Sequence, residues 1–441
     1  MNFKNLVIAN ITEVVGDLIA SMPKKQADFE IREDNCICDR FIFTETDDQI
    51  LVTPLPINPA FLNDSLKLLG LKNVINLFPE NCGLSICKDI LSDKKLNRTL
   101  MDLIRKNKNI NVYSYAGTKF FADLVRYWRK QGLKFNTPEL PADENRYIQD
   151  FFGSKAGFRQ AASLLGDDFL KMPEGAICSS KEEMFGWAGY LLKKGAGIVI
   201  KYNRGLAGAG LKIIKKEEVT GSVYDCLEKI IKEEIYFQKF PLVIEEFIPP
   251  DFNVCGGSPN VEIRIKNGKP ELLYTCSMRV TLEGIFRGIE IGKEVMATKL
   301  AAILTKTGMK LGNYLAQKGY QGYFEIDFVA GIDGKIYPIE SNLRRTGGTH
   351  VFEATQKLLG KNWAENYIVA KNIHDVAKLL GKKYEDIKQT VKHLLFPIKG
   401  KKEGVIFTSM GYLPYGKIGY LVIGKNKKST FEIESKFLKL C

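Results

Sequence analysis

The sequence predicts a protein of mixed α/β and α+β class, divided into roughly two to four domains. The chain has 441 residues, which is too long for a single hydrophobic core. Its first third alternates strand-like and helical runs, a pattern typical of a parallel sheet. Its middle has several strand-like runs in succession and ends in a hairpin, a pattern typical of antiparallel strands.

The amino-terminal region alternates regularly between short apolar runs and longer runs with helical periodicity. Asn58 and Pro59 mark the start of one of these helices. Because strands separated by helices pair in parallel, we expect one α/β domain over residues 1–145. We expect strands at 50–55, 74–77 and 110–115, and helices at 60–69, 91–106 and 120–130.

A proline-punctuated linker at 137–142 separates this region from a second one that is rich in strands. A helical stretch at 143–165 opens the second region, and a long helix at 293–318 precedes its last hairpin. Helical patterns dominate 351–395, and the tail 404–441 alternates like a small β unit. Between the two helices we expect strands at 197–202, 211–215, 242–246, 261–266, 271–280 and 285–291, and a helix near 223–235.

The segment 323–345 reads YFEIDFVAGIDGKIYPIESNLRR and predicts a β-hairpin. Asp333-Gly334 is a strong signal for a two-residue hairpin turn. A turn at those residues places Asp327 opposite Glu340, and Glu325 opposite Asn342. Because side chains alternate along a strand, these four share one face, and the apolar residues of the hairpin share the other.

Carboxylates placed opposite each other repel by roughly 3 kcal/mol at an effective dielectric near 20. A divalent cation would compensate that repulsion, and carboxylate and amide oxygens suit Mg²⁺ or Mn²⁺. A solvated acidic face, or a surface pair between Glu325 and Arg345, would also account for the pattern. The hairpin alone leaves these alternatives open.

A glycine-bearing loop follows the strand at 197–202. Lys201 stands near the end of that strand, and Gly205, Gly208 and Gly210 follow it before the next strand. Backbone N–H groups in such a loop can cradle phosphate oxygens, with the lysine adding positive charge. The loop leads into a strand, so it is neither a Walker A loop nor a dinucleotide-binding fingerprint. A flexible hairpin tip is the alternative interpretation.

The run LVIEEFIPPD at 242–251 is a short strand that leads into an extended, acidic linker. A carboxylate here could bind the amino group of adenine, and a backbone N–H could bind a ring nitrogen. Asp251 is placed for a ribose hydroxyl. The alternative is an edge strand with two solvated glutamates, Glu245 and Glu246.

The order of these pieces resembles the ATP-grasp superfamily over about residues 150–350. The most specific part is the Asp-x12-Glu-x-Asn spacing of Asp327, Glu340 and Asn342. The resemblance implies that these three hold Mg²⁺. It further implies roles for residues that would bind ATP: Lys155 and Lys201 at the phosphates, Glu245, Glu246 and Ile248 at adenine, and Asp251 at the ribose.

The chain departs from several of these ligases at Glu325, where they carry an arginine. Another cation would then stabilise negative charge on the transferring groups and on the oxyanion. We expect Arg279 and Arg345 in this catalytic role, with Arg344 as a further candidate. The few histidines include only one near the site, His350, and we expect it to be structural or to contact substrate.

The α/β region before the grasp, the stretch RRTGGTH at 344–350 and the small β tail resemble pre-ATP-grasp peptide ligases of the pheganomycin type. The implied architecture is a parallel α/β (pre-ATP-grasp) domain at 1–145, an ATP-grasp domain at 146–395, and a small β-rich unit at 396–441.

The resemblance implies an ATP-dependent carboxylate–amine ligase that works through an acyl phosphate and forms an amide or peptide bond. ATP and Mg²⁺, or Mn²⁺, would be its cofactors, and its substrates would be a small carboxylate and an amine, either amino acids or peptides. Two alternatives stay open: an ATP-grasp kinase or phosphotransferase, and a nucleotide-binding scaffold without chemistry. A homodimer also stays open.

Composition argues against other classes. The net charge is +13, but the lysines are spread along the chain and no nucleic-acid-binding motif is present, so we expect no nucleic-acid partner. No run of about 18 apolar residues and no signal peptide is evident, so we expect no membrane partner. The nine scattered cysteines fit reduced thiols. We therefore expect a cytoplasmic protein.

Overall fold

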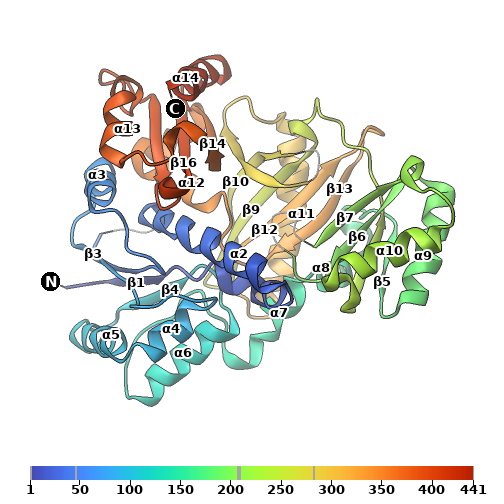
Figure 1. Cartoon of the computed structure of the whole chain (residues 1–441), viewed down its shortest axis with the longest axis horizontal. Coiled ribbons are helices and arrows are strands. Elements are labelled where there is room, and N and C mark those ends of the chain that lie inside the picture. Colours follow the sequence, from blue (N-terminus) through green and yellow to red (C-terminus); the bar gives the residue numbers. More distant parts are fainter. Residues whose placement is uncertain (1, 45–46, 206–209, 282–283, 441) are drawn as a thin grey trace.

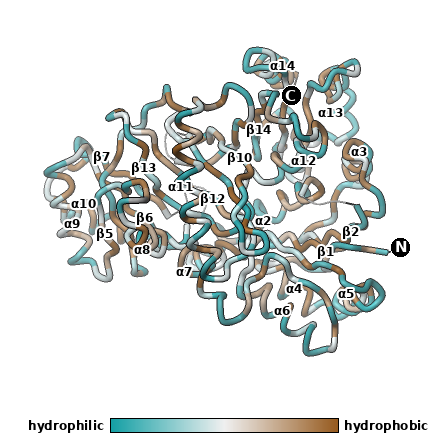
Figure 2. The backbone as a smooth tube through the Cα atoms, turned by 180° about the vertical axis from the view of Figure 1, so that it is seen from behind, coloured by the Kyte–Doolittle hydropathy of each residue, from teal (hydrophilic) through white to brown (hydrophobic). Residues whose placement is uncertain are grey.

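The computed structural model describes residues 2–44, 47–205, 210–281 and 284–440, and it contains three β-sheets. Figure 1 shows the amino-terminal sheet at one side, a large central sheet, and a small sheet at the far end. Hydrophobic stretches of the chain lie mostly along the strands in Figure 2. The site predicted from the sequence falls between the small and the large sheet.

The amino-terminal sheet is parallel throughout, with strand order β3-β2-β1-β4, which confirms the expected α/β arrangement. Asn58 caps α3 by accepting the N–H of Phe61, and Gly70 ends that helix in the left-handed region at φ 65°. The strands are β1 (Asn5–Ile8), β2 (Gln49–Val52), β3 (Val74–Leu77) and β4 (Asn111–Ser114). The helices are α1 (Gly16–Ile19), α2 (Lys24–Cys36), α3 (Pro59–Leu69), α4 (Ile86–Ser92), α5 (Lys94–Lys106) and α6 (Lys119–Lys130).

The small sheet is antiparallel, with order β5-β8-β6-β7. Two helices, α9 and α10, pack on it around a shared apolar core (Figure 1). The expected helix at 143–165 divides into α7 and α8 at Gly153 and Ser154, where Ser154 caps α8. The elements are α7 (Tyr147–Phe152), α8 (Lys155–Leu165), β5 (Gly175–Cys178), α9 (Lys181–Lys194), β6 (Gly197–Tyr202), β7 (Leu211–Lys215), α10 (Val223–Glu233) and β8 (Leu242–Glu246).

The large sheet has eight strands in the order β13-β12-β9-β10-β11-β14-β16-β15. Helix α11 packs on the apolar face of β9 and β12, and α12 lies on the opposite face. Its elements are β9 (Pro259–Lys266), β10 (Lys269–Val280), β11 (Phe286–Gly292), α11 (Thr298–Gln317), β12 (Gly322–Ala330), β13 (Ile336–Asn342), α12 (Thr349–Leu359), β14 (Tyr367–Asp375), α13 (Tyr384–Thr390), β15 (Gly404–Ser409), β16 (Lys417–Gly424) and α14 (Lys427–Leu440).

The carboxy-terminal third differs from the expected elements in three ways, the first of which is that Lys427–Leu440, expected in the β tail, forms helix α14. The stretch 351–395 contains a nine-residue strand, β14, among its helices. The tail strands β15 and β16 do not form a sheet of their own, because β16 pairs with β14 and so extends the large sheet. Apolar alternation revealed the tail strands but could not reveal which strand they join.

The hairpin turn also differs from the prediction. Asp333 and Gly334 do not form a two-residue turn: the loop spans Ile332 to Gly334, and the N–H of Gly331 donates to the carbonyl of Lys335. Gly334 adopts φ 77°, as in three-residue hairpin loops. A bulge between Asp327 and Phe328 shifts the register back by one residue, so the predicted pairs at the site are kept.

The joint between β11 and β14 gives a stability prediction. A Cβ at Gly288 would overlap the carbonyl oxygen of Ala370 on β14, whereas nothing lies within 4 Å of a Cβ at the exposed Gly186 of helix α9. We expect Gly288→Ala to lower the free energy of unfolding by more than about 2 kcal/mol. Gly186→Ala should raise it by up to about 1 kcal/mol. Urea unfolding measures both free energies. Equal stability of the two variants would contradict the close packing of β11 against β14 at Gly288.

Candidate active site between two sheets

The hairpin brings its acidic residues together in the predicted pairs. Asp327 lies opposite Glu340, and Glu325 lies opposite Asn342, in the antiparallel register of β12 and β13. Strand β9 completes the face from the other side, with Asn260 opposite Asp327 and Glu262 opposite Glu325.

Two amides cross-link the carboxylates of this face. Nδ2 of Asn260 donates to Oδ1 of Asp327 at 2.5 Å and to Oε2 of Glu325 at 3.1 Å. Nδ2 of Asn342 donates to Oε1 of Glu325 at 3.1 Å and to Oδ2 of Asp327 at 3.4 Å. Sequence reasoning missed Asn260, because only the pairing of β9 with β12 brings it here.

Burial and charge repulsion dominate the electrostatics. Burial, and then the neighbouring Glu340, raise the pKa of Asp327 to about 7. Burial, and then Asp327 and Glu262, raise the pKa of Glu325 well above its usual range. The face therefore favours added positive charge, which either protons or a cation can supply.

The predicted metal ligands fit a magnesium ion in part. Asp327 and Glu340 offer carboxylate oxygens on neighbouring strands, but Oδ1 of Asn342 accepts from Nη2 of Arg344 at 2.6 Å. Asn342 would have to turn this oxygen inward to serve as a ligand. Among the described residues, no three His, Cys, Asp or Glu side chains form a metal-binding group, so the amide would be needed to complete the set.

Two lysines reach this face from the other side of the site. Lys155, the first residue of α8, places Nζ 3.0 Å from Oε1 of Glu340 and 3.5 Å from the carbonyl of Gly205. Lys201, on β6, donates from Nζ to the carbonyl of Ile339 at 3.1 Å. Their side chains are only 7% and 4% exposed, so α8 and the small sheet supply buried cations to an acidic face of the large one.

The glycine loop is described at its two ends. Gly205 faces Lys155 through its carbonyl, whereas Gly208 lies outside the described residues. Gly210 adopts φ 79°, and a Cβ there would come within 2.9 Å of Cβ of Tyr202. Its carbonyl accepts the N–H of Tyr202 at 2.7 Å. Glycine is therefore required where the loop rejoins the small sheet.

The acidic linker is held by the protein's own donors. Glu245 is buried between Lys201, with which it forms an ion pair, and Arg159, whose Nη2 lies 2.7 Å from Oε1. Burial opposes the charge of Glu245, but these two cations outweigh it and lower the pKa. Glu246 accepts the N–H of Glu174 at 2.8 Å. Contact of either carboxylate with adenine would require a change of partner.

Backbone groups of the linker could bind an adenine base in place of the two carboxylates. The N–H and the carbonyl of Ile248 have no hydrogen-bond partner within the described ranges. Asp251 lies next to the end of the hairpin, where its N–H donates to the carbonyl of Ala330 at 2.7 Å. Its carboxylate accepts from the N–H and Nδ2 of Asn253.

The arginines are arranged differently from the expectation. Arg279 is three residues from Cys276, whose Sγ donates to Asn260, so strand alternation puts Arg279 on the opposite face of the large sheet. There its Nη1 lies 2.7 Å from Oε1 of Glu434 in α14. Arg279 is therefore removed from the candidate site.

Arg345 is also directed elsewhere. Its guanidinium pairs with Glu139 at 2.9 Å and with Glu353 at 3.0 Å, and it lies over the ring of Tyr323. The neighbouring Arg344 instead contacts Asn342, so of these arginines it is the one that reaches the acidic face.

Arg159 is a further residue that sequence reasoning missed. It lies four residues after Lys155 in α8, so both side chains leave the same face of the helix. That spacing was visible in the sequence, and it could have pointed to Arg159 once Lys155 was suspected.

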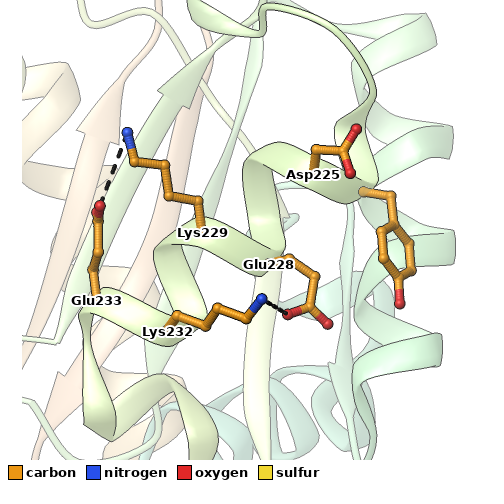
Figure 3. Close-up of a pocket in the computed structure, with 6 residues that line it drawn as sticks. Asp225, Glu228, Lys229, Lys232 and Glu233 are labelled. Carbon is orange, nitrogen blue, oxygen red and sulfur yellow. Dashed lines mark ion pairs between the residues drawn. The ribbon is translucent and has the colours of Figure 1, made fainter.

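A hollow on the outer surface of the small domain is separate from this site. Its lining comes from α10, where Lys232 pairs with Glu228 at 3.7 Å and Lys229 with Glu233 at 3.9 Å (Figure 3). These ion pairs join four of its lining side chains to one another. None of the residues predicted for the site lines it.

Comparisons with known proteins place the fold. No protein-family model and no curated protein matches the chain. Among solved structures, an ADP complex of N5-carboxyaminoimidazole ribonucleotide synthetase is 12% identical with a TM-score of 0.56, covering 99% of this chain and 97% of that one. Biotin carboxylase from Campylobacter jejuni is 14% identical with a TM-score of 0.56, covering 98% and 90%.

A third structure, N5-carboxyaminoimidazole synthase from Aspergillus clavatus in complex with ADP and an aminoimidazole ribonucleotide, is 10% identical with a TM-score of 0.54, covering 100% and 98%. Because the similarity spans whole chains, it includes the amino-terminal domain and the carboxy-terminal strands. It confirms the predicted fold class, a parallel α/β domain followed by a strand-rich α+β region. No helix in the described ranges has the length and apolar character that spanning a membrane requires.

The pairing of Glu245 gives a second stability prediction. Glu245→Gln leaves Lys201 and Arg159 without their buried counter-charge, and we expect it to cost about 3 kcal/mol in the free energy of unfolding at neutral pH. Glu246→Gln is the matched control, because the amide oxygen can still accept the N–H of Glu174, and its effect should stay within about 0.5 kcal/mol.

The cost of Glu245→Gln should depend on pH with a defined sign. The folded pKa of Glu245 is lowered, so its charge stabilises the protein above the ordinary glutamate value near 4.3 and loses that effect as pH falls through the lowered value. The difference between wild type and variant in urea unfolding should therefore shrink below about pH 4. A pH-independent difference would contradict a charged Glu245.

Proposed function

We propose that this protein is an ATP-dependent ligase that joins a carboxylate to an amine through an acyl phosphate. One observation carries the proposal. Buried lysines from α8 and the small sheet meet half-buried carboxylates from the large sheet across one site. The resemblance stated from the sequence and the shared fold support the same assignment.

Each ion pair at this site can exchange one protein partner for a group of MgATP. Lys155 now neutralises Glu340, and Lys201 now neutralises Glu245. Nucleotide phosphates can take over the lysines, and a divalent cation can take over Glu340 and Asp327. MgATP thus supplies one new partner to each side, so no buried charge is left alone.

Adenine would lie along the linker, bound by the open backbone groups of Ile248 and flanked by Glu245 and Glu246. Asp251 would bind the ribose, and Gly205, Gly208 and Gly210 would approach the phosphates. A magnesium or manganese ion held by Asp327, Glu340 and Asn342 would neutralise phosphate oxygens and polarise the γ-phosphoryl group.

The first step moves the γ-phosphoryl group from ATP to an oxygen of the substrate carboxylate, and ADP leaves. Lys155 and Lys201 hold the charged oxygens in line for this transfer. In the second step the amine nitrogen attacks the acyl carbon, the C–O bond to phosphate breaks, and the nitrogen loses a proton. Arg344 is the guanidinium placed to stabilise the oxyanion between these events, in place of Arg279 and Arg345.

The finer identity of the substrates follows the pheganomycin-type resemblance. We propose amino acids or short peptides as the carboxylate and the amine. The three structural neighbours carry other names, so this part of the proposal is supported by the sequence pattern alone.

Asp327 provides a test that separates function from folding. Asp327→Asn keeps an oxygen that accepts from Asn260 and removes a charge that Glu340 repels, so we expect a higher melting temperature without nucleotide. ATP turnover should fall by about a hundredfold or more, because the cation loses a carboxylate ligand.

The matched control is Glu271→Gln, which removes an exposed carboxylate of β10 that pairs with Arg264. It should leave turnover unchanged. Phosphate release with Mg-ATP and pooled amino acids and short peptides measures both variants. Wild-type turnover in Asp327→Asn would remove Asp327 from the metal site.

Oxygen transfer tests the reaction class. A ligase should transfer ¹⁸O from a labelled substrate carboxylate into the released phosphate, and steady turnover should require the amine. A kinase would release ADP with one substrate and retain the phosphate on its product. Phosphate free of label, formed at a rate independent of amine, would exclude the ligase.

A further inference from the structure

A buried arginine next to the candidate site has no partner that accounts for its charge. Arg40 follows α2 and is only 5% exposed. In the part of the chain that the structure describes, it forms no ion pair and no hydrogen bond, and its guanidinium lies over the ring of Tyr115. No nitrogen of Arg40 is both fully buried and unpartnered, so the guanidinium still reaches solvent, and its positive charge is open to a bound anion.

The nearby acidic side chains do not fill this role. The side chains of Asp34 and Asp39 lie close enough to interact electrostatically with Arg40, but neither forms an ion pair with it in the described residues. Asp39 is engaged by Oγ of Ser409 and by the N–H groups of Met410 and Gly411.

Tyr115 connects Arg40 to the site. The guanidinium carbon of Arg40 lies 5.7 Å from the centre of the Tyr115 ring, and that of Arg344 lies 5.6 Å from it. Nη1 of Arg344 also donates to the hydroxyl of Tyr115 at 3.2 Å, while Nη2 contacts the metal-ligand candidate Asn342. Two arginines thus flank one aromatic ring at the edge of the proposed reaction centre.

His350 adds a second unpartnered group. It is the second residue of α12, which packs against the segment that carries Arg40. His350 is 2% exposed, and its Nδ1 is buried without a hydrogen-bond partner among the described residues. Burial, and then the charge of Arg40, lower the pKa of His350 well below its usual range, so the ring is neutral and can donate or accept. The helix amino terminus there favours negative charge as well.

We infer that Arg40 and His350 form a binding site for a second, non-reacting oxyanion of the carboxylate substrate, with Arg344 at the reacting end. The inference rests on the proposed ligase function and narrows its substrate class. The substrate would carry two anionic groups, either two carboxylates or a carboxylate and a phosphate. Tyr115 would separate the two ends.

Binding without nucleotide tests this directly. Calorimetric titration of the full chain with glutarate, inorganic phosphate and butyrate compares a dicarboxylate, a phosphate and a monocarboxylate. We expect glutarate or phosphate to bind at least about tenfold more tightly than butyrate, because hydrogen bonds to a charged group contribute about 1.5–3 kcal/mol. The tighter of the two identifies the second anion as carboxylate or phosphate.

The variant Arg40→Met should lower the affinity for the tighter anion by about tenfold or more and leave butyrate binding unchanged. Arg98→Met, which removes an exposed arginine of α5, is the charge-matched control and should change neither. Unchanged affinity of folded Arg40→Met for all three ions would overturn the inference.

If Arg40→Met does not fold, the same calorimetric titrations of Arg40→Lys test the inference. Lysine keeps the charge but cannot form two parallel hydrogen bonds, so the tighter anion should again weaken while butyrate does not. Equal affinities in Arg40→Lys and wild type would overturn the inference. A ligase that turns over monocarboxylates as well as dianions would overturn it while the proposed function stands. Anion binding at Arg40 in a protein that shows no ligase turnover would support this inference and contradict the proposed function.

Discussion

The structure depends on a concentration of buried and half-buried carboxyl groups on one face of the large sheet. Glu262, Glu325, Asp327 and Glu340 share this face across β9, β12 and β13. Such an arrangement is unfavourable unless amides, hydroxyls and cations surround it. The contacts of Asn260, Asn342, Lys155 and Arg344 supply them. The position of α8 and of the loop after β13 therefore follows from an electrostatic requirement of three strands.

Local sequence signals predicted the part of this site that local structure determines. Asp327 and Glu340 lie on two strands joined by a short loop, so a turn signal and strand alternation were enough to pair them. The turn itself was wrong by one residue, and the bulge after Asp327 cancelled the error at the site. The buried strands of the parallel sheet were likewise recognisable from their apolar runs.

Residues placed by long-range packing could not be predicted in this way. Arg279 was expected in the site, but its face depends on the register of β10 against β9, which no local pattern determines. Arg345 and Arg344 are adjacent in sequence and point to different partners, and only the bend after Asn342 separates them. Arg40 was missed, because its proximity to Tyr115 depends on the folded amino-terminal domain, and its proximity to α12 arises only when that domain packs on the large sheet.

The loop after Asn342 also explains how one fold can tolerate Glu325 and Glu262 as neighbours. Glu262 is fully buried and accepts hydrogen bonds from the hydroxyls of Tyr274, Thr346 and Thr349. Thr346 belongs to the loop and Thr349 is the first residue of α12, so the carboxylate holds the loop against the sheet and fixes the start of α12. That anchoring holds the loop in which Arg344 donates to Asn342, and it holds the first turn of α12, which carries His350. The buried acid is therefore a structural anchor for the loop that carries Arg344 and for the start of α12.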